Sequence, residues 1–342
     1  MAKEVKLSDI AQRLGISTVS VSKALSDQKG VSEKMRMEVK RIASEMGYVS
    51  PTEARLMREK KSFNIGVIIS QKYFDQTQSF YWVMYQELAT AAVARNSFTM
   101  LEVIREEEEE SCQSPKLLDG DHINGLVIVG YMKEEYLSMV RSNAKVPIVY
   151  LDFYGKENSC DAVVTDNYFG MYQMTDYLCK LGHRKIAYLG TLLTTNSITD
   201  RYFGYCKALL ENGIELQDKY LIKDRFEDTG IMTGYSLELP QKENMPTAFV
   251  CNCDVAALKL IEKLGEAGYR VPEDISVVGF DDYAFQNTKE IGLTTYAVDV
   301  KEMSRKAVKI LCRRMAGDDK EKSISVVEGR MVIRESAKEI SR

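Results

Sequence analysis

The sequence predicts an α/β protein in which a small helical head precedes a two-lobed core of doubly wound parallel sheets. Residues 7–46 carry apolar residues at helical spacing without the alternation of a strand. From Phe63 onward, short unbroken apolar runs alternate with amphipathic stretches, as is typical of strands buried on both faces of a parallel sheet. The 342 residues are also too many for a single small domain. We expect a head over 1–49, a linker over 50–61 and a core over 62–342.

Composition and cysteine usage exclude several classes of protein. The 45% hydrophobic and 28% charged content is ordinary for a globular chain. No apolar run approaches the roughly 18 residues of a membrane span, and the opening MAKEVKLSDI lacks the apolar segment of a secretory signal. Seven cysteines and two histidines resemble neither a disulfide framework nor a metal-ligand set. We therefore expect a cytoplasmic protein without a membrane partner, metal or cofactor.

Charge is distributed unevenly along the chain. Residues 1–61 contain 13 Lys or Arg against 8 Asp or Glu, and the remainder contains 33 against 42. A basic head on an acidic body suits a polyanionic partner, because the head is attracted to phosphates while the body is repelled. This asymmetry favours nucleic acid as a partner of the head.

The head reads as three short helices over 7–14, 18–25 and 32–46. A helix-turn-helix needs a small residue where its first two helices touch, a glycine in the turn, and a branched apolar residue beneath the second helix. Ala11, Gly15 and Val21 meet these needs at the required spacing. A plain three-helix bundle is the alternative, but the basic excess favours a double-stranded DNA partner.

The second helix is the expected recognition helix. Val21, Ala24 and Leu25 should face inward, which leaves its N-terminal half to enter the major groove. Short hydroxyls suit phosphate oxygens, a valine can touch a thymine methyl group, and a lysine can reach a guanine edge. With the residue that opens the first helix, the predicted DNA contacts are Leu7, Ser17, Thr18, Val19, Ser20, Ser22, Lys23 and Ser26.

The segment after Tyr48 is expected to form a linker with one or two helical turns. Such a short helix would be ordered only against a second copy of itself or against DNA. Leu56 or Met57 would then be an apolar wedge for the minor groove, and Arg55 would lie near phosphates. A solvated tether is the alternative.

The core pattern alternates strands with helices. Strands are expected at 64–69, 98–103, 124–129, 146–152, 162–166, 184–190, 247–251 and 275–280. Helices are expected at 81–96, 169–181, 201–212, 255–268 and 301–316. Ligands of such sheets bind outside the carboxyl ends of the strands, which places the expected site in the cleft between two lobes.

A series of motifs spans nearly the whole chain, from KLSDIAQRLGISTVSVSKAL through NIGVII, NGLVIVG, VPIVYLD, LGHRKIAYLG, DRYFGYCKAL and VPEDISVVGFDD to VIRES. In their order and spacing these motifs resemble the lactose and galactose repressor family of bacterial transcription regulators. The resemblance implies a helix-turn-helix head, a hinge helix, and a core built like the type I periplasmic sugar-binding proteins, acting as a homodimer on a pseudo-palindromic operator. The implied lobes are about 62–162 plus 296–324, and about 163–295 plus 325–342.

The resemblance also implies which residues bind a small effector in the cleft. Asp152, Arg201 and Asp281 match positions that hold the hydroxyl groups of a sugar or sugar derivative, and carboxylates and a guanidinium suit such a ligand. The other implied effector-binding residues are Ser197, the ring pair Phe80 and Tyr81, and Asp254. Each of these could instead be a satisfied structural polar group or a core aromatic. The family's usual Asn-Asp pair appears here as Cys253-Asp254, which leaves the effector's identity open.

Three functions compete on these observations. The leading hypothesis is a DNA-binding regulator, most often a repressor, whose operator affinity is controlled by a carbohydrate effector. An extracytoplasmic sugar receptor would share the core, but it would need a signal peptide and would have no basic head. An enzyme is disfavoured because the sequence has no phosphate-binding glycine loop, nucleophile elbow or HExxH helix.

Overall fold

The structure is a computed structural model that describes residues 5–26, 30–48, 62–73, 80–157, 159–227, 230, 232, 237–283 and 292–340. The chain divides into two compact units, Met1–Lys61 and Ser62–Arg342. Each unit is described by itself.

The first unit contains three helices, α1 (Leu7–Leu14), α2 (Thr18–Leu25) and α3 (Glu33–Glu45). Gly15 ends α1 in the left-handed conformation, at φ 65°. The Ser17 and Ser32 side chains cap α2 and α3 by accepting hydrogen bonds from backbone N–H groups three residues on. The predicted helices are confirmed.

A small apolar core holds the three helices together. Its buried members come from all three helices, and they are Ile10, Ala11, Val21, Ala24, Val39, Ile42 and Ala43. Val21 and Ala24 lie inward as their spacing predicted. Because Val21 and Ala24 turn one face of α2 toward this core, the opposite face of the helix is exposed to solvent.

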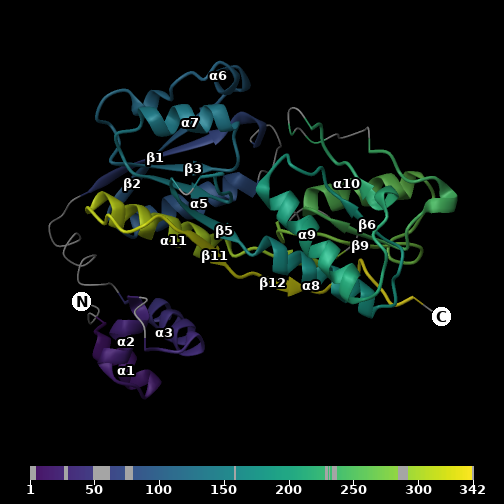
Figure 1. The fold of residues 1–342 in the computed structure, drawn as a ribbon, viewed down its shortest axis with the longest axis horizontal. Helices are drawn as coiled ribbons and strands as arrows, with labels where there is room; N and C mark the ends of the chain where they lie inside the picture. The colour runs from purple at the N-terminus through teal and green to yellow at the C-terminus, as the bar shows by residue number, and fades with distance from the viewer. Residues whose placement is uncertain are drawn as a thin grey trace. The chain divides into compact units, whose positions relative to one another are not determined.

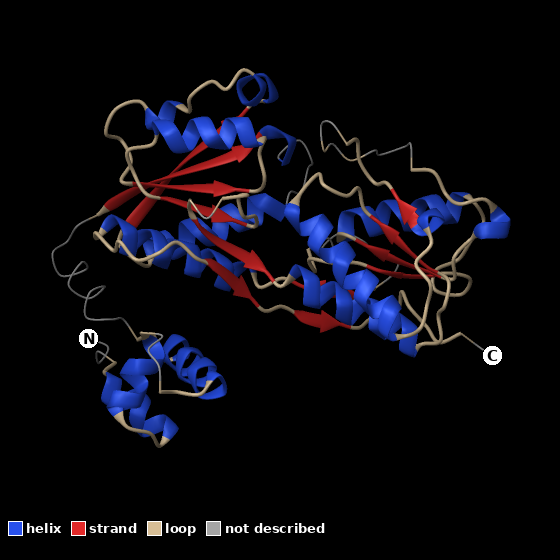
Figure 2. Cartoon of the chain, viewed as in Figure 1, coloured by secondary structure: helices blue, strands red, loops and turns tan. Residues whose placement is uncertain are grey.

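The second unit is built on two parallel sheets (Figures 1 and 2). The larger sheet has the strand order β11-β5-β4-β3-β1-β2. Its strands, in chain order, are β1 (Phe63–Ser70), β2 (Ser97–Ile104), β3 (Gly125–Val129), β4 (Ile148–Leu151), β5 (Asp161–Thr165) and β11 (Ile324–Val327). The smaller sheet has the order β7-β6-β8-β9. Its strands are β6 (Ile186–Leu189), β7 (Leu221–Ile222), β8 (Ala248–Cys251) and β9 (Ser276–Val278).

Helices cover both faces of each sheet, so the central strands are buried on both sides. On the larger sheet, α5 (Phe80–Val93) and α11 (Val300–Met315) pack on one face, and α7 (Glu134–Asn143) packs on the other. On the smaller sheet, α8 (Asn167–Lys180) and α9 (Asn196–Glu211) pack on one face, and α10 (Asp254–Glu266) on the other. The short α6 (Glu106–Glu110) follows β2.

The chain passes between the two sheets three times. It leaves the larger sheet after β5, returns to it after β10 (Thr295–Ala297), and leaves again after β11 to form β12 (Arg330–Val332), which pairs antiparallel with β10. The pairing of β5 with β11 continues to Thr165 and Val327. The larger sheet therefore extends three residues beyond each of the lobe boundaries expected at 162 and 324.

Several short elements were not expected from the sequence. The strands β7, β10, β11 and β12 have two to four residues, which is too few for a periodic signal. Helix α9 begins at Asn196, five residues before the expected start, because the Thr195 side chain caps it by accepting from the Ile198 N–H at 3.2 Å. Arg201 therefore lies inside α9, whereas the sequence analysis placed it at the start of a helix.

Candidate functional site

The outward face of α2 carries most of the predicted DNA contacts. Thr18, Val19 and Ser22 are exposed, with Val19 at 60%, while Lys23 is half-buried. The first turn of α2 contains no acidic side chain, so its unpaired N–H groups and the positive end of its dipole are left available to phosphate oxygens. The arrangement offers a helix N-terminus, small contact residues and one cation to a DNA groove.

The hydroxyl groups of this region are organised by contacts within the helix. The Ser17 and Ser20 hydroxyl oxygens lie 2.9 Å apart, and the Ser26 hydroxyl donates to the Ser22 carbonyl at 2.7 Å. Leu7 is half-buried and packs against the apolar core of the head, so packing accounts for much of its side chain. The predicted linker contacts Arg55, Leu56 and Met57 lie outside the described residues.

The second unit contains a cavity of about 290 Å³. Its walls come from both lobes and mostly follow the carboxyl ends of strands, as expected for doubly wound sheets. The described lining residues are Lys72, Tyr73, Phe80, Tyr81, Asp152, Thr195, Ser197, Ile198, Arg201, Arg225, Gly230, Met232, Asn252, Cys253, Val255 and Asp281. Six of the seven predicted effector residues, all but Asp254, are thus brought together.

Asp152 presents an unsatisfied oxygen in this cavity. The residue follows β4 in a left-handed conformation, at φ 70°, and is only 6% exposed. Its Oδ2 accepts from the Tyr81 hydroxyl at 3.0 Å, while its Oδ1 is buried without a hydrogen-bond partner. Burial raises the pKa of Asp152 to about 6, although Arg201 and the Tyr81 hydroxyl act to lower it. A ligand that donates a hydrogen bond would satisfy Oδ1.

Arg201 and Asp281 lie together on the other lobe. The Arg201 guanidinium donates from Nε to the Asn167 side chain at 2.8 Å and from Nη1 to the Asn252 carbonyl. The Nη2 atom of Arg201 lies 3.4 Å from Oδ1 of Asp281. The Cζ atom of Arg201 lies over the Phe280 ring, 3.8 Å from the ring centroid. Burial raises the pKa of Asp281 well above its ordinary value, against the lowering effect of Arg201. Arg201 is therefore held in place before any ligand binds.

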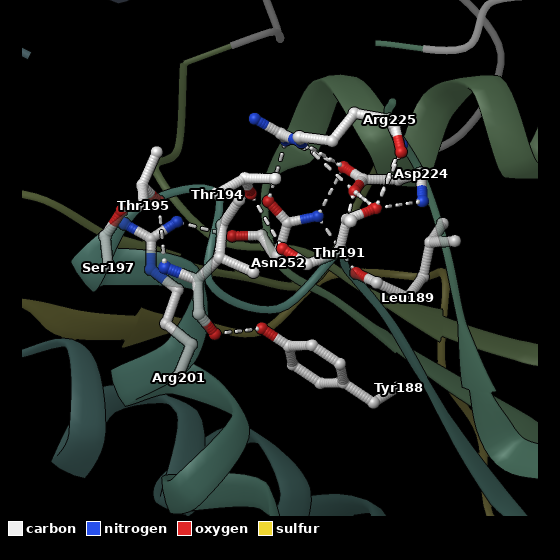
Figure 3. Close-up of polar contacts among 11 residues, drawn as sticks. Tyr188, Leu189, Thr191, Thr194, Thr195, Ser197, Arg201, Asp224, Arg225 and Asn252 are labelled. Carbon is white, nitrogen blue, oxygen red and sulfur yellow. Dashed lines mark hydrogen bonds and ion pairs between the residues drawn. The ribbon is translucent and has the colours of Figure 1, made fainter. Parts of the chain in front are cut away.

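A second guanidinium, that of Arg225, reaches the cavity from the loop after β7. Its Nε lies 3.1 Å from each carboxylate oxygen of Asp224, and its Nη2 donates to Asp224 at 2.7 Å and to the Asn252 side chain at 3.1 Å. Thr191 and Asn252 also donate to Asp224, at 2.9 Å from the Thr191 N–H and 2.7 Å from the Asn252 amide. Figure 3 shows these contacts as dashed lines, and one terminal nitrogen of Arg225 carries none.

Aromatic rings form much of the wall from the larger-sheet lobe. The ring centroids of Tyr73 and Tyr81 are 4.4 Å apart, and the Phe80 ring meets Tyr81 edge-on at 5.5 Å. Both tyrosine rings rest against Gly130, at φ 75°, where an added Cβ would lie 2.8 Å from Tyr73 and 3.0 Å from Tyr81. Rings of this kind can pack against the apolar faces of a sugar.

Asp254 has a different position from the one that the resemblance implied. It is fully buried and does not line the cavity. Its carboxylate accepts from the Thr295 hydroxyl at 2.6 Å and the Tyr283 N–H at 3.0 Å, and burial raises its pKa to about 7. Because it opens α10, its side chain points back into the protein, and Asn252 and Cys253 lie at the cavity in its place.

The sequence analysis did not identify several lining residues. Arg225 lies in a loop, and Lys72 and Tyr73 lie in the 3-10 helix Gln71–Tyr73, which is too short for a periodic signal. Lys72 and Tyr73 come shortly after the strand predicted at 64–69, so their place near its carboxyl end was the one available signal. Arg225 follows a strand of two residues, which sequence periodicity cannot detect.

Two kinds of feature are absent from the described residues. No helix is long and apolar enough to cross a membrane. No group of three or more histidine, cysteine, aspartate or glutamate side chains is arranged to hold a metal ion.

Comparisons with known proteins agree with this arrangement. Residues 6–50 match the model for bacterial regulatory proteins of the lacI family, and residues 175–337 match that for a periplasmic binding protein-like domain. The transcriptional repressor PurR of Vibrio atlanticus is 27% identical over 341 residues, covering 98% of this chain and 99% of the relative.

Solved structures show the same architecture. The complex of the transcriptional regulator CelR with cellobiose has a TM-score of 0.69 at 25% identity, covering 98% of this chain and all of that one. A regulator from Enterococcus faecium with bound ribose also has a TM-score of 0.69, at 24% identity over 81% of this chain.

A helix-turn-helix head joined to a two-lobed core with a polar interlobe cavity defines a class of protein, the ligand-controlled DNA-binding transcriptional regulators. The relatives named above are regulators and not enzymes. The chain thus has a helix-turn-helix domain of the lacI family of bacterial regulatory proteins followed by a periplasmic binding protein-like domain.

Proposed function

We propose that this regulator acts in the cytoplasm as a homodimeric repressor on a pseudo-palindromic operator, and that a saccharide bound in the interlobe cavity controls its operator affinity. The observation that carries the effector proposal is the pairing of opposite hydrogen-bonding demands in one cavity. Oδ1 of Asp152 is buried without a donor, whereas Nη1 of Arg225 has no acceptor among the described residues. A hydroxyl group does both, so a polyol can meet both demands at once.

The aromatic wall supports the same class of ligand. A sugar ring has polar edges and apolar faces, and the cavity offers the carboxylates of Asp152 and Asp281 beside the rings of Tyr73 and Phe80. The relatives' ligands, cellobiose and ribose, are saccharides. Phe80, Tyr81, Asp152, Ser197, Arg201 and Asp281 are the residues that we propose bind it.

The outer edge of the larger sheet supports the dimer. β2 pairs with a strand on one side only, and it exposes Phe98 (57%), Met100 and Val103. Trp82 on the neighbouring helix α5 is also exposed, and its ring lies 5.6 Å from that of Tyr85, whose hydroxyl is 3.3 Å from the Thr99 hydroxyl on β2. An exposed apolar edge strand is a surface that a second copy would cover.

Thermodynamic linkage connects the two activities. A saccharide that binds one arrangement of the lobes more tightly than another shifts the population of the dimer, and operator affinity changes with it. Coupling of about 1–3 kcal/mol is typical of such systems. By reciprocity, operator DNA must change saccharide affinity by the same factor.

The test combines two measurements on the full chain. Selection from a pool of randomised duplexes should enrich a two-fold symmetric site, and a thermal-shift panel of mono- and disaccharides that includes cellobiose and ribose should identify a stabilising ligand. That ligand should alter operator binding in the wild type but not in Arg201→Ala. Failure to enrich any duplex would refute DNA recognition, and failure of every saccharide to stabilise the chain would refute the effector proposal.

A further inference from the structure

The cations that line the cavity are all matched by carboxylates. Arg225 pairs with Asp224 at 2.7 Å, Arg201 with Asp281 at 3.4 Å, and Lys72 with Glu109 at 3.7 Å. These are the only lysine or arginine residues among the described lining residues. Asp152 is left as a buried carboxylate with a tyrosine hydroxyl, and not a cation, as its nearest partner. The balance of formal charge around the cavity is therefore negative.

The Arg225 guanidinium has its strongest binding edge occupied. A carboxylate or phosphate binds arginine most tightly when two N–H groups on different nitrogens point at its two oxygens. Asp224 fills the edge formed by Nε and Nη2, and Asn252 takes the remaining N–H of Nη2. Only Nη1 is without a partner among the described residues. A single nitrogen can donate to hydroxyl or ring oxygens, but it cannot form the paired contact that an acid prefers.

Hydrogen bonds hold Asp224 in the position where it occupies the edge of Arg225 formed by Nε and Nη2. It receives hydrogen bonds from the Thr191 N–H at 2.9 Å, the Thr191 hydroxyl at 3.2 Å and the Asn252 amide at 2.7 Å. Burial acts to raise the pKa of Asp224, but the Arg225 charge and these hydrogen bonds lower it overall. The lowered pKa keeps Asp224 ionised, and the hydrogen bonds drawn as dashed lines in Figure 3 hold its carboxylate in place.

We propose that the cavity selects uncharged saccharides over acidic ones, and that Asp224 is the residue that enforces this selection by occupying and neutralising Arg225. The inference rests on the proposed function, since it specifies which saccharides the same cavity accepts. An acidic sugar would meet a blocked arginine together with the unpaired carboxylate of Asp152. An uncharged sugar could accept from Nη1 and donate to Asp152 without burying a new charge.

Matched sugar pairs test the selection on the full-length wild type. The probes are glucose with glucuronate, galactose with galacturonate, and cellobiose with cellobiouronate, each measured by thermal shift and titration calorimetry at pH 7.5. In every pair that binds, we expect the uncharged member to bind about tenfold or more tightly than the acid. Equal or tighter binding of the acid would overturn this inference and leave the saccharide proposal standing. If neither these sugars nor any other saccharide of the thermal-shift panel binds, both the selection and the saccharide proposal are refuted.

The variant Asp224→Asn tests whether Asp224 enforces the preference for uncharged sugars. Asparagine cannot supply a charge or two equivalent acceptors, so it should free an edge of Arg225 and narrow the preference for the uncharged sugar by about tenfold. The matched control is Glu227→Gln, which removes one negative charge nearby from an exposed pair with Lys223 and should leave the preference intact. An unchanged preference in folded Asp224→Asn, or an equal change in the control, would refute the role of Asp224.

Two further variants keep the test decisive if Asp224→Asn does not fold. Thr191→Val removes the hydroxyl contacts to Asp224 and to the Arg225 backbone but keeps the hydrogen bond from the Thr191 N–H to Asp224. It should narrow the preference in the same direction by a smaller factor. Arg225→Gln retains a neutral donor, so it should weaken uncharged sugars less than Arg225→Met does. If both Arg225 variants weaken binding equally, Arg225 does not act as a neutral donor and the inference fails.

Discussion

Replacing Asp152 with asparagine should stabilise the protein while removing its response to effector. The pKa of Asp152 is raised from 3.8 to about 6, and at 1.36 kcal/mol per unit this shift is worth about 3 kcal/mol. Because the folded state binds the proton more tightly than the unfolded state, stability falls as pH rises from about 4 to about 6, and above that range the full penalty is present. Asparagine cannot ionise and avoids it.

The geometry permits this exchange. An asparagine oxygen can still accept from the Tyr81 hydroxyl, and its NH₂ group would occupy the place of the unpartnered Oδ1. For a chain of this size, about 3 kcal/mol corresponds to a rise in Tm of about 4 °C. The affinity for the effector should fall, since the hydroxyl group that donates to Oδ1 of Asp152 would then meet the NH₂ group of asparagine, which is also a donor. Binding sites commonly show such a conflict between stability and function.

Scanning calorimetry of the full chain between pH 4.5 and 7.5 checks this prediction. The rise in Tm of Asp152→Asn over the wild type should be largest at pH 7.5 and should become smaller toward pH 4.5. Asp224→Asn is the opposite control, because the pKa of Asp224 is lowered and its ionised pair stabilises the fold above the unfolded pKa, so its removal should lower Tm. A lower Tm for Asp152→Asn at pH 7.5, or a gain independent of pH, would refute the reasoning.

Three other predictions concern the head, the core packing and the dimer. Lys23→Ala should weaken operator binding by about 1–3 kcal/mol in fluorescence anisotropy and preserve saccharide binding; loss of both would contradict separate sites. Gly204→Ala should lower Tm by several degrees, since its Cβ would overlap the Tyr168 carbonyl between α8 and α9; an unchanged melting curve would exclude that contact. Phe98→Asp should shift the chain from dimer to monomer in sedimentation, and a retained dimer would exclude the β2 edge.

The head was predictable from sequence because its structure is determined by local interactions. The bounds of α1 and α2 follow from Gly15, the Ser17 cap and the spacing of apolar residues within one or two turns. The strands buried on both faces of the larger sheet were equally visible, since β1 and β3 are continuous apolar runs. The short strands β7 and β12 were not, because pairing with distant strands and not local pattern creates them.

The candidate site divides in the same way. Asp152 and Asp281 could be proposed from their places after strands and from the family resemblance. The position of Asp254 could not, because whether the first residue of α10 faces the cavity or Thr295 depends on a strand 41 residues away. The same holds for Arg225, whose availability depends on contacts with Asn252, 27 residues further along the chain.

The amino-acid sequence by itself determined the helices of the head, the alternation of strands and helices in the core, and the kinds of side chain at the strand ends, since these depend on neighbours within a few residues. The tertiary structure alone decided which charges oppose one another in the cavity. Asp152 and Asp224 are both buried aspartates. Burial outweighs the effect of Arg201 and raises the pKa of Asp152, while Arg225 and the surrounding donors lower the pKa of Asp224. That difference arises from segments brought together only by folding, because electrostatic interactions depend on distance and solvent exclusion and not on order along the chain.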